Sequence, residues 1–138
     1  MSDVVSFPFV WVTNALNESV RRPLVPISLT LGNKTVSTVA LIDTGADVSV
    51  LPFGIGLELG AVWDDQKITL ELSGNLSKFE ARGLLLSGTI GSLKPARLAF
   101  AWTQSDQARL ILGQTNFFDE FSVCVHRFNN SFEIQSRN

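Results

Sequence analysis

The sequence predicts an all-β domain built as a small barrel, closed or partly open. Short apolar segments recur along the whole chain, and clusters of glycine, asparagine and proline separate them. Several of these segments alternate apolar and polar residues, and only one segment carries clear helical signals. Many short strands with regular turns are typical of barrels and sandwiches, not of folds that alternate strands with helices.

Composition limits the possible functions. The chain has 138 residues, of which 45% are hydrophobic, which fits one domain with a substantial core. Its net charge is −2 and it has no basic block, so we expect no nucleic acid partner. No apolar run is long enough to span a bilayer, and the N-terminus lacks the pattern of a signal peptide. We therefore expect a cytoplasmic protein without a membrane partner.

The elements can be placed in order along the chain. Residues 23–31 and 35–42 form a predicted hairpin, and a strand at 48–51 follows. Residues 53–61 contain three glycines and predict a turn or one short helix. Further strands are expected at residues 67–72, 77–86, 96–102, 121–128 and 131–135, and residues 109–113 form a short apolar segment. Residues 114–121 predict one short helix, whose phenylalanines form a core stripe.

Cysteine and histidine are too scarce for a metal centre. Cys124 is the only cysteine and His126 the only histidine, so neither a disulfide within the chain nor a structural zinc site is expected. We interpret Cys124 as a core residue and His126 as a strand residue near an edge, and we interpret Trp11, Trp63 and Trp102 as packing residues. No cofactor and no metal ion are predicted.

The most informative segment is VALIDTGADVSVLP, residues 39–52. An apolar strand ends at Asp43, Thr44 and Gly45, and a second apolar strand begins at Val48. One carboxylate is thereby placed at the tip of a tight turn between two buried strands. A charge in that position lowers the stability of the fold unless it is hydrogen-bonded, shares a proton with another group or takes part in a reaction.

This segment resembles the active-site loop of the retropepsin-like aspartic proteases, the single-lobed relatives of pepsin. The residues after Asp43 follow in the order that the family uses, and a second family element, Leu110–Gly113 (LILG), precedes the predicted short helix. In the family, that element lies beside the catalytic loop. The resemblance implies a retropepsin-type barrel over residues 23–138 with one short helix near the C-terminus, in a cellular or bacterial member.

The resemblance also implies an aspartic endopeptidase. Two neighbouring carboxyls cannot both ionise freely, so they share one proton, and together they activate a water and protonate the leaving amide. Asp43 is the candidate carboxyl, and Thr44 offers a hydroxyl that can hold a neighbouring loop. Gly45 and the small Ala46 allow the substrate backbone to approach closely.

One copy of the chain supplies only half of such a site. The remaining aspartates have no Thr-Gly or Ser-Gly after them. We therefore expect a twofold homodimer, required for activity, in which two copies of Asp43 face each other on the axis. Residues 1–22 form an N-terminal extension that supplies a dimer strand, masks the cleft, or does neither. In viral relatives, the chain ends hold the dimer together.

Further site residues are implied by the same resemblance. The Ser49 hydroxyl is expected to bond Thr115, and residues 72–79 are the candidate for a hairpin flap over the cleft, with Gly74 at its tip. The residues expected to contact a peptide or protein substrate are Gly45, Ala46, Asp47, Val48, Gly74, Asn75 and Ile111.

The chain departs from the family at one position. Many viral members carry an arginine directly after the apolar-apolar-Gly element, where it pairs with the acid that corresponds to Asp47. Gln114 stands there in this chain. The partner of Asp47 therefore stays open between a hydrogen bond from Gln114 and a charge from Arg82 or Arg109.

Two other functions are compatible with parts of the pattern. A non-catalytic module of the same fold could bind extended peptides by strand pairing, although binding alone has no need for a costly acid pair. A phosphotransfer enzyme could use Asp43 as its nucleophile. Such enzymes need a second acid two residues later, where this chain has Gly45.

Overall fold

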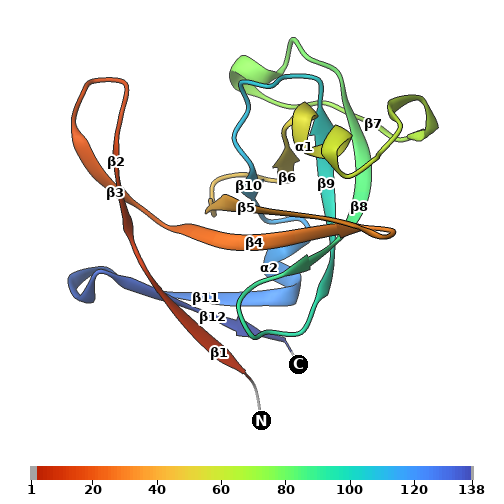
Figure 1. Cartoon of the computed structure of the whole chain (residues 1–138). Helices are drawn as coiled ribbons and strands as arrows, with labels where there is room; N and C mark the ends of the chain where they lie inside the picture. Colours follow the sequence, from red (N-terminus) through yellow and green to blue (C-terminus); the bar gives the residue numbers. More distant parts are fainter. Residues whose placement is uncertain (1–2, 138) are drawn as a thin grey trace.

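The computed structural model describes residues 3–137, and a β-barrel lies at its centre (Figure 1). The strands are β1 (Val4–Pro8), β2 (Val10–Thr13), β3 (Ser19–Arg22), β4 (Leu24–Leu31), β5 (Lys34–Ile42), β6 (Ser49–Leu51), β7 (Thr69–Leu70), β8 (Ala81–Thr89), β9 (Ala96–Thr103), β10 (Ile111–Leu112), β11 (Phe121–His126) and β12 (Ser131–Ser136). The helical elements are α1 (Phe53–Glu58), α2 (Phe117–Glu120) and the 3₁₀ turns η1 (Trp63–Asp65), η2 (Gly74–Leu76) and η3 (Arg127–Asn129). Within the described residues, no helix has the length and apolar character needed to cross a membrane.

Six of the strands in the described part of the chain close into the barrel. Their order is β4-β5-β10-β6-β9-β8, and pairing between β8 and β4 completes the ring, with β7 added at the free edge of β8. The short strand β10 lies between two neighbours, parallel to β5 and antiparallel to β6. The prediction of an all-β barrel with one short helix near the C-terminus is thus confirmed, and α1 is the short helix that residues 53–61 allowed.

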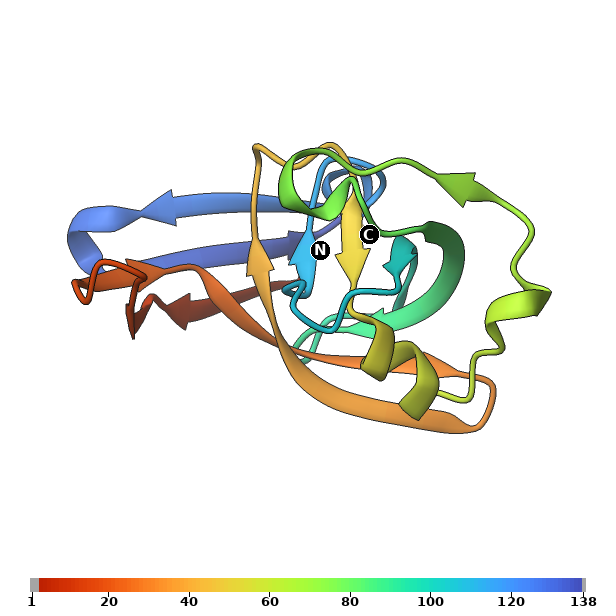
Figure 2. The ribbon, with the colours of Figure 1, turned by 90° about the horizontal axis from the view of Figure 1, so that it is seen from above.

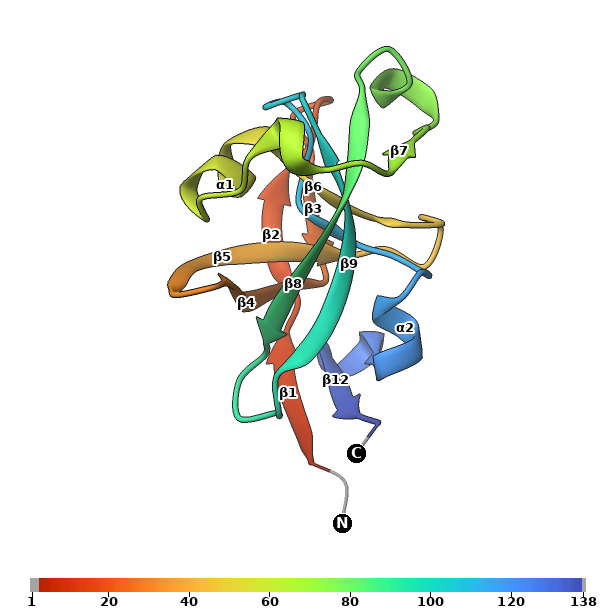
Figure 3. The same cartoon turned by 90° about the vertical axis from the view of Figure 1, so that its right-hand side faces the viewer.

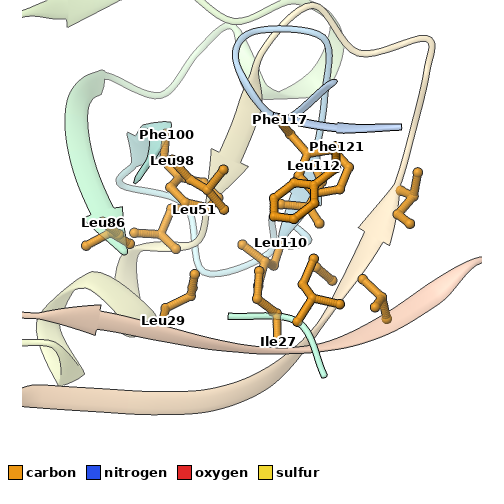
Figure 4. Close-up of a cluster of buried hydrophobic side chains, with 14 of the residues drawn as sticks. Ile27, Leu29, Leu51, Leu86, Leu98, Phe100, Leu110, Leu112, Phe117 and Phe121 are labelled. Atoms are coloured by element: carbon orange, nitrogen blue, oxygen red, sulfur yellow. The ribbon is translucent and has the colours of Figure 1, made fainter. Parts of the chain in front are cut away.

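Alternating residues of the barrel strands fill the core, as Figure 4 shows. On β4, Val25, Ile27 and Leu29 are buried while the residues between them face outward, which is the period of two that a strand imposes. Phe117 and Phe121, at either end of α2, reach the same core and stack on each other with ring centroids 5.1 Å apart. The predicted phenylalanine stripe therefore closes one end of the barrel.

Helix α1 packs directly on the ring of the buried Trp102. A Cβ atom at Gly56 would collide with that ring, and the Trp102 indole Nε1 donates a hydrogen bond to the Phe53 carbonyl oxygen at 3.1 Å. The glycine that weakens the helical propensity of this segment is therefore what lets the helix lie against the barrel.

A second, three-stranded sheet joins the two ends of the chain, in the order β1-β12-β11. Val4 to Pro8 pair antiparallel with Gln135 to Ser131, and Phe7 of β1 stacks on the buried Phe132 of β12. The first strand of the N-terminal extension thus pairs within its own chain and adds apolar side chains to the common core.

Strands β2 and β3 form a separate hairpin that stands apart from both sheets (Figures 1 and 2). Its turn is held by the Asn14 side chain, whose Oδ1 accepts hydrogen bonds from the backbone N–H groups of Leu16 and Glu18. Such local bonds are typical of well-formed turns.

The segment between β7 and β8 differs from the prediction of two long alternating strands. Pairing of β7 with β8 stops at Leu70, opposite Ala81. Residues 71–80 instead contain η2, where the Ser77 hydroxyl donates to the Gly74 carbonyl oxygen at 2.8 Å. Local side-chain bonds of this kind compete with strand pairing, so the hairpin is real but its strands are shorter than expected.

Two packing predictions were wrong. Cys124 is exposed, because alternation along β11 sends Phe121 and Val123 toward the core and the residue after Val123 toward solvent. Trp11 is also exposed, since it lies on the separate β2–β3 hairpin. His126 lies near the edge of its sheet as predicted, because β11 is an edge strand.

Candidate active site

Asp43 directly follows β5 and begins the loop that leads to β6. Its backbone N–H donates to the Leu112 carbonyl oxygen at 3.0 Å, and its own carbonyl oxygen accepts from the Ala46 N–H at 3.2 Å. The Gly45 N–H donates to the carboxylate oxygen Oδ1 at 2.9 Å. The half-buried carboxylate is thereby oriented by its own loop, while Thr44 and Gly45 at the tip are exposed.

Segment 110–115 braces this loop from the side, as the family resemblance implied. The Gln114 N–H donates to the Ala46 carbonyl oxygen and the Thr115 N–H to the Asp47 carbonyl oxygen, each at 2.9 Å. The Gln114 side chain adds a third bond, from Nε2 to the Thr44 carbonyl oxygen at 2.8 Å. The loop that carries Asp43 is therefore hydrogen-bonded along most of its length to a second segment.

Gly113 and Ser49 form the buried contact between the two segments. The Ser49 hydroxyl accepts a hydrogen bond from the Gly113 N–H at 3.0 Å, and its residue is 1% exposed. A Cβ atom at Gly113 would lie 2.6 Å from the Val48 carbonyl oxygen and 2.7 Å from that of Ala46. Ser49 and Thr115 are joined through the backbone, N to O at 3.4 Å, whereas the sequence suggested a bond from the Ser49 hydroxyl.

Asp47 is exposed and has no ionic partner among residues 3–137. The Gln114 side-chain amide donates its hydrogen bond to the Thr44 carbonyl oxygen. Arg82 pairs with Glu80 at 2.7 Å, and its guanidinium lies over the Trp63 ring at 4.6 Å. Of the three candidate partners, Gln114 and Arg82 thus bind elsewhere in a single copy of the chain, and Arg109 forms no ion pair among residues 3–137 either.

An apolar groove of about 660 Å³ starts beside this loop. Val48 and Thr115 line it beside the Asp43 loop, and Ile68 and Leu70 line it near β7. Its remaining lining residues are Leu31, Gln66, Lys67, Gly83, Leu84, Leu85, Ala99, Phe100 and Ala101. Of the residues predicted to contact substrate, Val48 lines this groove, whereas Ile111, Gly74 and Asn75 lie outside its lining.

The candidate flap and the Asp43 loop lie on the same side of the barrel. In Figure 3, the connection between β7 and β8 lies above the loop that links β5 to β6, and Figure 2 shows the two on the same side from a second direction. Gly74, in η2, has a left-handed backbone with φ +65° and open space around its α-carbon.

Comparison with known proteins adds one result. No protein-family model and no curated protein matches this sequence. Among solved structures, a retropepsin-like aspartic protease from Rickettsia conorii aligns with 99% of this chain and 94% of its own, with a TM-score of 0.61 and 16% identity. The chain has a retropepsin-like fold. At this level of identity, the likeness concerns the fold alone.

In this retropepsin-like fold, a single copy presents one loop carboxylate and one adjoining groove. The β5–β6 loop occurs once in the described chain, and no other described aspartate follows a buried barrel strand with the same sequence. One copy therefore orients a single carboxyl beside the groove, and within the described residues it has no second acid in an equivalent loop.

Proposed function

We propose that this protein is an aspartic endopeptidase that works as a homodimer, in which two copies of Asp43 hold the attacking water between them. The observation that carries this proposal is the fixed Asp43 loop, braced by segment 110–115 within a retropepsin-like fold. Such bracing holds a carboxyl group in place without burying it, which a reaction at an exposed peptide bond requires.

The reaction uses the two carboxyls in opposite protonation states. The ionised Asp43 takes a proton from the water while the water oxygen bonds to the carbonyl carbon of the peptide. The protonated Asp43 of the second copy donates its proton to the carbonyl oxygen. When the resulting tetrahedral intermediate collapses, the C–N bond breaks and the amine nitrogen receives the proton that the first Asp43 took from the water. A hydroxyl of the intermediate returns a proton to the second Asp43. Because one shared proton is needed, activity is expected in mildly acidic solution.

The other residues position the peptide in this proposal. Gly45 and Ala46 let its backbone approach, and the Asp47 carboxylate binds its N–H groups. Val48 and Ile111 contact its side chains, of which one enters the apolar groove. Residues 72–79, with Gly74 and Asn75 near the tip, cover it as a flap.

Cleavage of a peptide library tests the proposal. Asp43→Asn keeps the size of the side chain but removes the acid, so cleavage should fall to background from about pH 4 to 7. The matched control is Asp65→Asn, which makes the same change at an exposed acid in η1. Inhibition by a pepstatin-type peptide should accompany the wild-type activity. Equal cleavage by Asp43→Asn would refute the proposal, and peptide binding without turnover would favour a binding module instead.

A further inference from the structure

The β2–β3 hairpin carries apolar side chains that the protein does not use for its own core. Trp11 and Leu16 are 63% and 78% exposed, and Val10 is also exposed. Val12 and Val20 are half-buried and stand opposite each other across the two strands. None of these five residues belongs to the core or to the side chains packed against it.

A two-stranded hairpin of this kind is marginally stable when nothing covers it. In the described part of the chain, β2 and β3 pair only with each other. An exposed cluster of apolar side chains on such an element marks an interaction surface more often than a solvated one. The hairpin therefore needs a surface that the single chain does not provide.

The base of the hairpin is fixed to the turn between β11 and β12. Arg21 donates to the Asn130 side-chain Oδ1 at 2.9 Å, and the Phe9 N–H donates to the Asn130 carbonyl oxygen at 3.0 Å. Arg127 lies over the Phe9 ring at 5.1 Å. We call residues 10–22 together with residues 125–130 the clasp. Its second part adds Phe128, which is 90% exposed.

The clasp points toward the place where a second copy must sit. Both Figure 1 and Figure 2 show β2–β3 and β11–β12 projecting beyond the barrel on the side where β5 ends and the Asp43 loop begins. Activity as proposed above requires the Asp43 of a second copy beside this loop. Any such copy would lie next to the projecting hairpins.

The charges of the clasp also favour a second copy of the chain as its partner. The clasp contains three arginines, Arg21, Arg22 and Arg127, against one acid, Glu18, whereas the whole chain has a net charge of −2. The loop that the second copy presents carries an exposed Asp47 without an ionic partner among the described residues. The basic, apolar clasp of one copy and the acidic loop side of another are complementary.

We propose that the clasp is the main dimer contact of this protein and that the two projecting hairpins of each copy pack against the other copy. This inference rests on the proposed function, because the two-aspartate site is incomplete without a second copy. It differs from a dimer held together by exchanged chain ends, since β1 already pairs with β12 of the same chain over five residues.

Sedimentation over a range of protein concentrations tests the clasp without reference to activity. All chains carry Asp43→Asn, which prevents self-cleavage. The triple variant Trp11→Thr, Leu16→Ser and Phe128→Ser removes the most exposed apolar side chains of the clasp and leaves the core untouched. Its dimer dissociation constant should rise by at least about tenfold, as loss of exposed aromatic anchors at an interface does.

The control is the double variant Leu57→Ser and Val62→Thr, which removes comparably exposed apolar side chains from α1 and from the segment before η1. It should dimerise like the parent. In the parent, amide hydrogen exchange of residues 10–22 should slow as the concentration rises and the dimer forms.

Three outcomes would overturn the clasp. A parent dimer that the triple variant leaves intact would place the interface elsewhere, and the proposed function would stand. A parent that stays monomeric at every concentration would remove the dimer contact altogether. A parent that binds anionic phospholipid vesicles through these residues without dimerising would assign the surface to a membrane. Failure of the proposed function is read separately, from peptide cleavage by Asp43→Asn and by the wild type.

Discussion

Replacing Ser49 by alanine tests whether segment 110–115 fixes the Asp43 loop. The Ser49 hydroxyl is the hydrogen-bond acceptor for the Gly113 N–H, and the pair is buried. Alanine removes the acceptor and leaves this N–H without a partner in a site too tight to admit another. A buried donor left in this way costs about 1–3 kcal/mol. For a domain of this size, the midpoint of thermal unfolding should fall by roughly 4–10 °C.

Ser28→Ala is the matched control. The Ser28 hydroxyl pairs with that of Ser37 at 3.2 Å on the outer side of the barrel, where water replaces the lost partner, so the change should stay within about 0.5 kcal/mol. Urea unfolding followed by tryptophan fluorescence measures both variants, at one fixed protein concentration because dimerisation adds to stability. If Ser49→Ala costs no more than Ser28→Ala, the buried contact does not fix the loop.

Three further predictions concern the same side of the barrel. Gly113→Ala places a Cβ within 2.7 Å of two carbonyl oxygens and should abolish cleavage and lower the midpoint of thermal unfolding. Gly83→Ala, whose nearest contact is at 3.5 Å, is the control for stability alone, because Gly83 lines the groove. It should leave the midpoint unchanged, and equal midpoints for the two variants would contradict a tight contact at Gly113. Gln114→Ala removes the bond to the Thr44 carbonyl oxygen and should reduce kcat while costing less than about 1 kcal/mol of stability, so a loss confined to stability would argue against a positioning role. Ala99→Leu narrows the groove and should raise KM severalfold for peptides with large apolar side chains but not for those with small ones; a uniform change would show that the groove holds no substrate side chain.

Those parts of the barrel whose structure depends on residues close together in the sequence could be predicted. Strands β4 and β5 alternate cleanly around a tight turn. Helix α2 forms where its phenylalanines and its acids Asp119 and Glu120 predicted it, but its N-cap is Asn116 and no side chain caps it. The connection between β7 and β8 was predicted less well, because the Ser77–Gly74 hydrogen bond favours η2 over a longer ladder. Alternation alone does not reveal this competition.

The N-terminal strands could not be placed for a different reason. Strand β1 takes its partner, β12, from the opposite end of the chain, and pairing over that distance leaves no local pattern. The β2–β3 hairpin did have a readable signal in Asn14 and Asn17, of which Asn17 has φ +63°. Because the sequence analysis did not predict that hairpin, it did not predict the exposure of Trp11 either.

In the site too, features with a local sequence signal could be predicted and features that depend on distant segments could not. The position of Asp43 at the end of a strand and its contact with segment 110–113 follow from two short motifs, so they could be anticipated. The groove could not, because its lining comes from segments spread over much of the chain. Its only sequence signal is the presence of small residues, Gly83, Ala99 and Ala101, at alternating positions of two paired strands. The bond from Gln114 to Thr44 depends on three-dimensional contact alone.

Mixing wild type with Asp43→Asn at constant total concentration shows whether cleavage needs the acids of two copies. If the catalytic unit contains one Asp43 from each copy, an equal mixture that has exchanged subunits holds only about a quarter of its dimers with both acids. Its rate of peptide cleavage should therefore fall to about a quarter of the wild-type rate. A rate of about one half, as for chains that act independently, would contradict the account.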